Sequence, residues 1–177
     1  MVGEIIGYLA LVLNLVALLM PNRKKLLGVQ IAASVMFVGH YSVLGALSGA
    51  LQESLKILRN AAFINAAKLD LSNQKIFIII SVIALLLLVP SWSGWISVLP
   101  VVATLSGTYA RSQKNLEKLL LLGLVSTCLL LLYAILINSI PAILSYAIQL
   151  VVTSVALLRA ESRFHVLANK FVDWHIT

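Results

Sequence analysis

The chain has 177 residues, of which 61% are hydrophobic and only 11% are charged, and its mean hydropathy is +1.04. A soluble domain has about 45–50% apolar and about 25% charged residues, so this composition excludes a soluble globular protein and predicts an integral membrane protein. The formal net charge is +7. Because the cations lie between hydrophobic runs, we do not expect the chain to bind nucleic acid.

Hydrophobic runs predict seven transmembrane helices, which would leave no room for a separate soluble domain. The least regular of these runs carries Pro100 in its middle. The first run begins with Glu4, where a cleavable signal would carry basic residues, and its basic residues follow it, which predicts an uncleaved span with the N-terminus outside. The spans are expected at residues 4–20, 26–46, 48–67, 75–91, 93–110, 117–137 and 140–158.

The distribution of Lys and Arg supports this odd number of spans. With the N-terminus outside, every cation except Lys56 and Arg59 falls in a segment facing the cytoplasm, and the outer turns carry none. This segregation follows the positive-inside rule and predicts a multi-pass membrane protein with a cytoplasmic C-terminus. The cytoplasmic segments would be residues 21–25, 68–75, 111–118 and 159–177.

The tail from Arg163 to Thr177 carries a hydrophobic stripe at helical spacing. The stripe predicts an amphipathic helix lying in the membrane interface, and a frayed cytosolic tail is the alternative. Its residues are Phe164, Leu167, Phe171 and Trp174.

The chain contains an internal repeat at an offset of about 92 residues, and a shift by one residue fits nearly as well. At this offset Ser34 aligns with Ser126 and Tyr41 with Tyr133. Each half reads as span, basic loop, span, uncharged turn and span. The fold class is therefore predicted as an all-α membrane protein with two parallel three-helix repeats joined by an inversion helix. Its parts would be residues 1–67, 68–92, 93–158 and a tail at 159–177.

Several short motifs make the chain resemble the YgjV-type bacterial inner membrane proteins and, more distantly, the SWEET/PQ-loop transporters. They are Asn22-Arg23, His40-Tyr41, Leu44-Gly45, Arg59, Leu99-Pro100 with Thr104-Leu105-Ser106, and Asn138-Ser139-Ile140. The resemblance implies a 3+1+3 helix arrangement, and the broader superfamily implies transport of small solutes, sugars in particular. The chain lacks the Pro-Gln dipeptide of that superfamily; the nearest match is Pro21-Asn22.

The third span holds an unusual density of polar residues for a membrane helix. Helical spacing stacks Glu53 with Lys56 and Asn60, and Gln52 and Arg59 share an adjoining face. Ions at mid-depth usually face a bundle interior or water, so these residues predict the polar wall of a cavity. In the alternative, Glu53 and Lys56 merely neutralise each other while Arg59 snorkels inward.

Other polar residues at depth have two interpretations each. Asn14, Gln30 and Ser34 would contact a solute or join helices by hydrogen bonds. His40 would act as a gate or pH sensor, or bond a backbone group or hydroxyl. For Tyr41 and its repeat mate Tyr133 we favour interfacial anchoring over a place in the cavity.

The seventh span carries a polar stripe that pairs with the third span in the repeat. Ser145, Gln149 and Thr153 recur at every fourth position, with Tyr146 beside them. Such a stripe faces protein or water, so it serves either helix packing or a pore.

We expect a transporter of a small polar solute, sugar- or nucleoside-like, working by alternating access. A non-transporting membrane receptor or assembly protein on the same fold is the alternative. No enzyme activity, cofactor or metal is predicted, because no catalytic motif appears and histidines occur only at 40, 165 and 175. The expected partners are the solute and the lipid bilayer, and homo-oligomerisation stays open. The residues expected to bind solute are Asn14, Gln30, Ser34, His40, Gln52, Glu53, Lys56, Asn60, Ser145, Tyr146 and Gln149.

Overall fold

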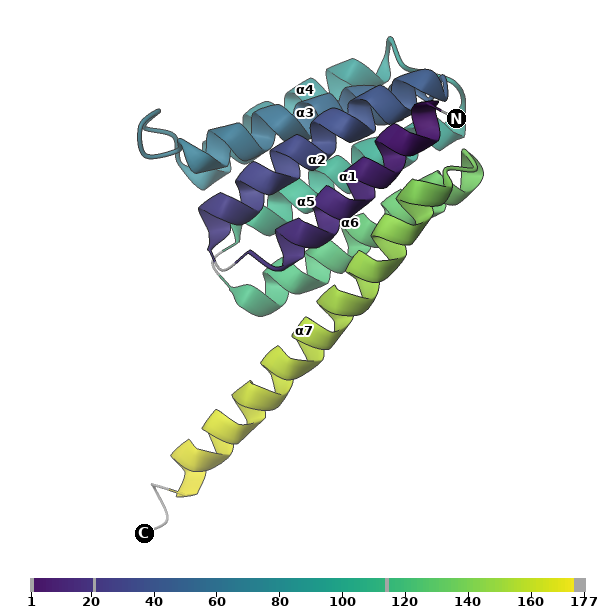
Figure 1. Ribbon diagram of the computed structural model, residues 1–177. Coiled ribbons are helices and arrows are strands. Elements are labelled where there is room, and N and C mark those ends of the chain that lie inside the picture. The colour runs from purple at the N-terminus through teal and green to yellow at the C-terminus, as the bar shows by residue number, and fades with distance from the viewer. Residues whose placement is uncertain (1, 21, 114, 174–177) are drawn as a thin grey trace.

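A computed structural model describes the backbone of residues 2–20, 22–113 and 115–173, and the side chains of these up to residue 159. Its helices follow one another with short connections (Figure 1). They are α1 (Val2–Leu18), α2 (Arg23–Val43), α3 (Leu47–Ile64), α4 (Asn73–Leu88), α5 (Val98–Ser112), α6 (Leu116–Leu136) and α7 (Ile140–Asp173), with a short 3₁₀ turn at Trp95–Ser97 before α5.

Each predicted span corresponds to one of these helices, and three of them are long and apolar enough to cross a membrane. These three are α2, α6 and the part of α7 from Ile140 to Arg159. Helices α1 and α4 are apolar but shorter. Helix α3 carries Glu53, Lys56 and Arg59, and α5 has only 15 residues. The all-helical fold is confirmed, while the count of seven spans stays a prediction.

Six of the helices form a closed ring, with α4 on its outside. Around the ring α1 packs on α2, α2 on α3, α3 on α5, α5 on α6, α6 on α7 and α7 on α1. Helix α4 contacts α3 and α5 and exposes apolar side chains such as Ile78, Val82 and Leu86. Its predicted role as an inversion helix between the two halves stays a prediction.

The two halves repeat with an offset of 93 residues, the separation of Glu53 and Tyr146. The same offset carries the bounds of α2 onto those of α6, and the start of α3 onto the start of α7. It also relates Asn22 to Asn115, which both cap their helices with a side-chain oxygen. The offset of 92 is therefore wrong by one residue, because the turn and cap positions fix the register better than the few matching letters do.

Helix α5 begins later than expected, and Pro100 lies in its first turn. The segment before it is the 3₁₀ turn Trp95–Ser97, which follows Gly94 with a φ of 101°. In the first turn of a helix the missing N–H of proline has no partner to lose, so Pro100 need not kink α5. The expectation of a proline in the middle of this span is wrong.

Helix α7 continues past the bundle as one unbroken helix to Asp173 (Figure 1). The expected amphipathic tail at 163–177 is thus, as far as the backbone is described, an extension of α7 rather than a separate helix. The side chains of its hydrophobic stripe lie outside the described residues.

Candidate functional site

A cavity of about 450 Å³ lies inside the ring of six helices. Its size is typical of small-molecule sites, which span about 300–1,000 Å³. The lining includes Asn22 and Arg23, which are exposed, so the cavity reaches the surface at the end where α1 meets α2. Toward the other end it stops at Phe37 and Tyr146, which are buried.

Most of the predicted site residues line this cavity. Of the remaining ones, His40 and Ser145 are buried between helices, and Gln52 points toward α4, where its Nε2 donates to the carbonyl of Ala84 at 3.2 Å. Those that line the cavity are Asn14, Gln30, Ser34, Glu53, Lys56, Asn60, Tyr146 and Gln149. Their binding of a solute stays a prediction.

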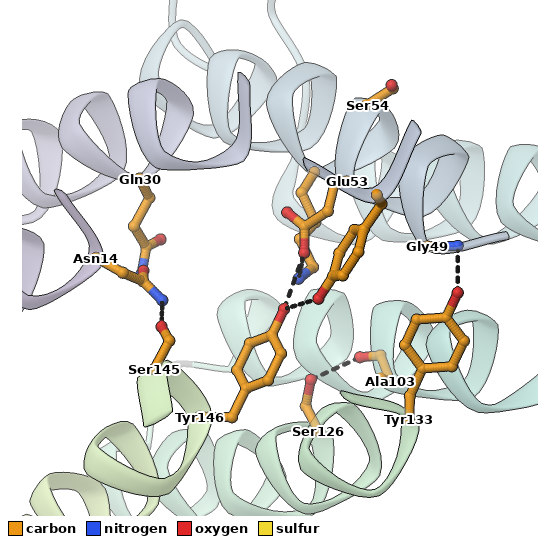
Figure 2. A network of polar contacts seen from close by, with 12 residues as sticks. Asn14, Gln30, Gly49, Glu53, Ser54, Ala103, Ser126, Tyr133, Ser145 and Tyr146 are labelled. Carbon is orange, nitrogen blue, oxygen red and sulfur yellow. Dashed lines mark hydrogen bonds and ion pairs between the residues drawn. The ribbon is translucent and has the colours of Figure 1, made fainter. Parts of the chain in front are cut away.

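Glu53 is the centre of a polar cluster at the inner end of the cavity (Figure 2). Its Oε1 accepts hydrogen bonds from Lys56 Nζ at 2.5 Å and from the Tyr146 hydroxyl at 3.1 Å. The hydroxyls of Tyr146 and Tyr41 are 3.3 Å apart. The Glu53–Lys56 ion pair of the alternative interpretation is therefore present, and Tyr146 ties it to α7.

A buried aromatic layer closes the end of the ring beyond this cluster. Tyr133 accepts a hydrogen bond from the backbone N–H of Gly49 at 2.9 Å (Figure 2), and its hydroxyl lies 3.0 Å from Ser48 Oγ. Tyr41 and Tyr133 are each 1% exposed, and their ring centroids are 6.1 Å apart. The expectation that they anchor the protein at the interface is wrong, because protein groups rather than headgroups satisfy their hydroxyls.

His40 belongs to this same closed end. Its Nδ1 donates to the carbonyl of Gly3 at 2.7 Å, and its Nε2 lies 2.7 Å from the Ser139 hydroxyl. Both ring nitrogens are thus used to join α1, α2 and the turn before α7. The structure favours the interpretation of His40 as a residue that bonds a backbone group and a hydroxyl.

Several other polar residues at depth hold helices together. Asn14 donates from Nδ2 to Ser145 Oγ at 2.8 Å, which joins α1 to α7 (Figure 2). Ser126 donates to the carbonyl of Ala103 at 2.7 Å, which joins α6 to α5. These bonds join neighbouring helices of the ring. Asn14 also lines the cavity, so its position fits both interpretations, the joining of helices and contact with a solute.

The sequence-based site omitted the guanidinium groups of the cavity. Arg23, Arg59 and Arg111 all line it, and Arg59 is 3% exposed. Arg59 was noted on a polar face but not included, and the other two were assigned to loops. Helical spacing could have indicated Arg111. It lies four residues after Gly107, so the two residues share one face of α5, and both line the cavity.

The comparisons with known proteins give one match. No curated protein sequence and no solved structure matches the chain. The likeness to SWEET transporters therefore stays a prediction. A family model described as Imp-YgjV, bacterial inner membrane protein, matches residues 1–163. Since this covers nearly the whole chain, the protein belongs to the Imp-YgjV family of bacterial inner membrane proteins.

Proposed function

We propose that this protein transports a small polar solute across the inner membrane by alternating access, with the two three-helix halves rocking around the central cavity. The observation that carries the proposal is a cavity lined by both polar and apolar side chains, which is open at one end of the ring and closed at the other by a hydrogen-bonded layer. Its volume of about 450 Å³ lies within the range of small-molecule sites, which supports binding of a solute.

The repeat supports a 3+1+3 arrangement related to that of SWEET transporters. Glu53 and Tyr146 occupy equivalent positions in the two halves and are hydrogen-bonded to each other. Two equivalent positions meet in this way where a pseudo-two-fold axis passes between them. Parallel repeats about an axis along the membrane normal are typical of transporters whose halves move against each other.

The open end carries the basic loops, so the cavity would face the cytoplasm. Arg23 and Arg111 lie at this end, and Arg23 donates from Nη2 to the carbonyl of Arg111 at 2.9 Å. By the positive-inside rule these segments are cytoplasmic, which puts the N-terminus outside. The conformation described here is then the inward-open one.

The test uses the closed end, where Ser48 is 2% exposed. We expect a single cysteine at Ser48→Cys, in a Cys128→Ser background, to react slowly with a membrane-impermeant maleimide added from outside. A transported solute should increase this rate several-fold, because the closed layer must open in each cycle. The probes are glucose, uridine, succinate and inorganic phosphate, together with uptake of each into proteoliposomes.

A matched control is Leu47→Cys, which is on the same helix end but 52% exposed and should react equally with or without solute. If no probe changes the Ser48→Cys rate and none is taken up, the transport proposal is wrong. The receptor or assembly role would then be favoured. We propose no enzymatic activity for either case.

A further inference from the structure

The charges around the cavity are strongly unbalanced. Its lining contains Arg23, Lys56, Arg59 and Arg111, but Glu53 is the only carboxylate among the described lining residues. Glu53 is engaged by Lys56 and by Tyr146. The guanidinium groups therefore dominate the electrostatic potential of the cavity.

Arg59 and Arg111 are held by neutral oxygens. Asn60 Oδ1 accepts from Nε and Nη2 of Arg59, each at 3.2 Å. Gln30 Oε1 accepts from Arg111 Nη2 at 3.1 Å and from Asn60 Nδ2 at 3.5 Å. Two amides thus link the two guanidinium groups in a chain across α3, α2 and α5. They orient the cations without neutralising them.

Within the described part of the chain, no carboxylate forms an ion pair with Arg59 or Arg111. A buried charge without a counter-charge is costly, and in a membrane protein it is normally compensated by a partner. Arg59 also keeps donors available: its Nη1 makes no hydrogen bond with any described residue. That atom lies 3.5 Å from the place that a Cβ on Gly107, another lining residue, would take.

We propose that the cavity binds a small doubly charged oxyanion, a dicarboxylate or a phosphate monoester, through the guanidinium groups of Arg59 and Arg111. The planar fork of arginine matches the oxygens of carboxylate and phosphate in paired hydrogen bonds. Two guanidinium groups without counter-ions call for two negative charges on the ligand. The inference rests on the proposed function, because it names the solute class of the same cavity.

The chain offers a near-isosteric variant that tests this directly. Gln30→Glu keeps an acceptor for Arg111 and Asn60 but supplies a counter-charge inside the protein. We expect Gln30→Glu to keep the fold and to bind succinate and inorganic phosphate at least about tenfold more weakly than the wild type, because a charge-assisted site is lost. The readout is the shift in Tm of the purified protein in detergent at constant ionic strength, with sodium chloride and glucose as negative probes.

The matched control is Asn115→Asp, which changes the net charge equally at an exposed helix cap that an aspartate also satisfies. It should bind the anions as the wild type does. Should Gln30→Glu fail to fold, Arg111→Gln at the end of α5 removes one guanidinium and is expected to show the same loss. Anion binding that survives in both variants overturns the proposal.

Phosphate is also found in lipid headgroups, so a further arm compares the soluble anions with nanodiscs containing phosphatidylglycerol. If only the lipid stabilises the protein, the proposal of a soluble anion is wrong and the cavity binds a lipid headgroup. A shift in Tm with glucose or uridine but not with the anions overturns the anion inference and leaves transport standing. Anion binding with neither opening at Ser48→Cys nor uptake into proteoliposomes supports the anion site and overturns transport.

Discussion

At the scale of single residues, buried polar side chains form hydrogen bonds between helices of the two halves. Tyr146 of α7 bonds Glu53 of α3, and Asn14 of α1 bonds Ser145 of α7. In hydrocarbon an unsatisfied polar group costs several kcal/mol, so each such bond also dictates which helices become neighbours. Within the described residues, only a few buried side-chain atoms lack a partner, among them Gln52 Oε1 and Thr104 Oγ1.

Gly49 is required by the close approach of Tyr133. A Cβ at this position would lie 2.8 Å from the Tyr133 hydroxyl and 2.9 Å from its Cε1, with Tyr41 Cδ2 at 3.1 Å. We expect Gly49→Ala to destabilise the protein by about 1–3 kcal/mol, because the buried rings cannot yield. Thermal unfolding in detergent measures this.

The control for that variant is Gly28→Ala on α2, where a Cβ would meet nothing within 4 Å. It should raise stability by about 0.5–1 kcal/mol, since alanine loses less backbone entropy than glycine in a helix. Equal effects of the two substitutions would show that the aromatic layer at the closed end is not packed as described.

The Glu53–Lys56 pair should behave as a unit. Glu53→Gln leaves the ammonium group without its counter-charge and should cost about 1–3 kcal/mol of unfolding free energy. Adding Lys56→Met should recover much of this, because the unpaired charge is then gone. A double-mutant cycle of thermal unfolding measures the coupling, and strictly additive effects would contradict the pair.

At the scale of elements, equivalent helices in the two halves are begun by the same device. Asn115 Oδ1 accepts from the backbone N–H groups of Glu117 and Lys118, and Asn22 does the same for Lys25. Such caps satisfy donors at the helix start that have no partner inside the helix. The shared cap fixes where α2 and α6 begin, and with it the register of the repeat.

Removing one cap should have a measurable cost. We expect Asn115→Ala to lower the unfolding free energy by about 0.5–2 kcal/mol, whereas Asn115→Asp, which retains an acceptor, should change it much less. Thermal unfolding of the two variants side by side checks this. If both lose the same stability, the side-chain oxygen does not cap α6.

At the scale of the whole molecule, the basic residues gather at one end of the bundle, and this gives a test of topology. Leu47, Ser93 and Ile140 lie at the opposite end and are exposed, whereas Ser139 is fully buried and unsuited to labelling. We expect single cysteines at 47, 93 and 140, in a Cys128→Ser background, to react with an impermeant maleimide added to spheroplasts. Lys24→Cys should react only after the membrane is opened.

The Cys128→Ser background is needed because Cys128 is exposed on α6. Labelling of Lys24→Cys in intact spheroplasts, or protection of all three opposite positions, would reverse the orientation. A mixture, with position 93 alone protected, would remove two spans from the count, one between positions 47 and 93 and one between positions 93 and 140.

The sequence by itself determined the helices, their approximate bounds and the family of this protein, because long apolar runs and segregated cations are local signals. It also placed Glu53, Lys56, Tyr146 and Gln149 in one region, since helical spacing and the repeat relate α3 to α7. The start of α5 was missed because Pro100 is equally compatible with a kink and with a first turn.

Only the tertiary structure decided what each polar residue does. From the sequence, Tyr41 could equally be an interfacial anchor and His40 a gating residue. Helix packing instead buries both in the closed end of the ring. Arg111 was predicted in a loop. It lines the cavity, where Gln30, which is distant in the sequence, accepts its hydrogen bond. Contacts of this kind depend on which helices are neighbours in the ring, and the spacing of residues along one helix does not contain that information.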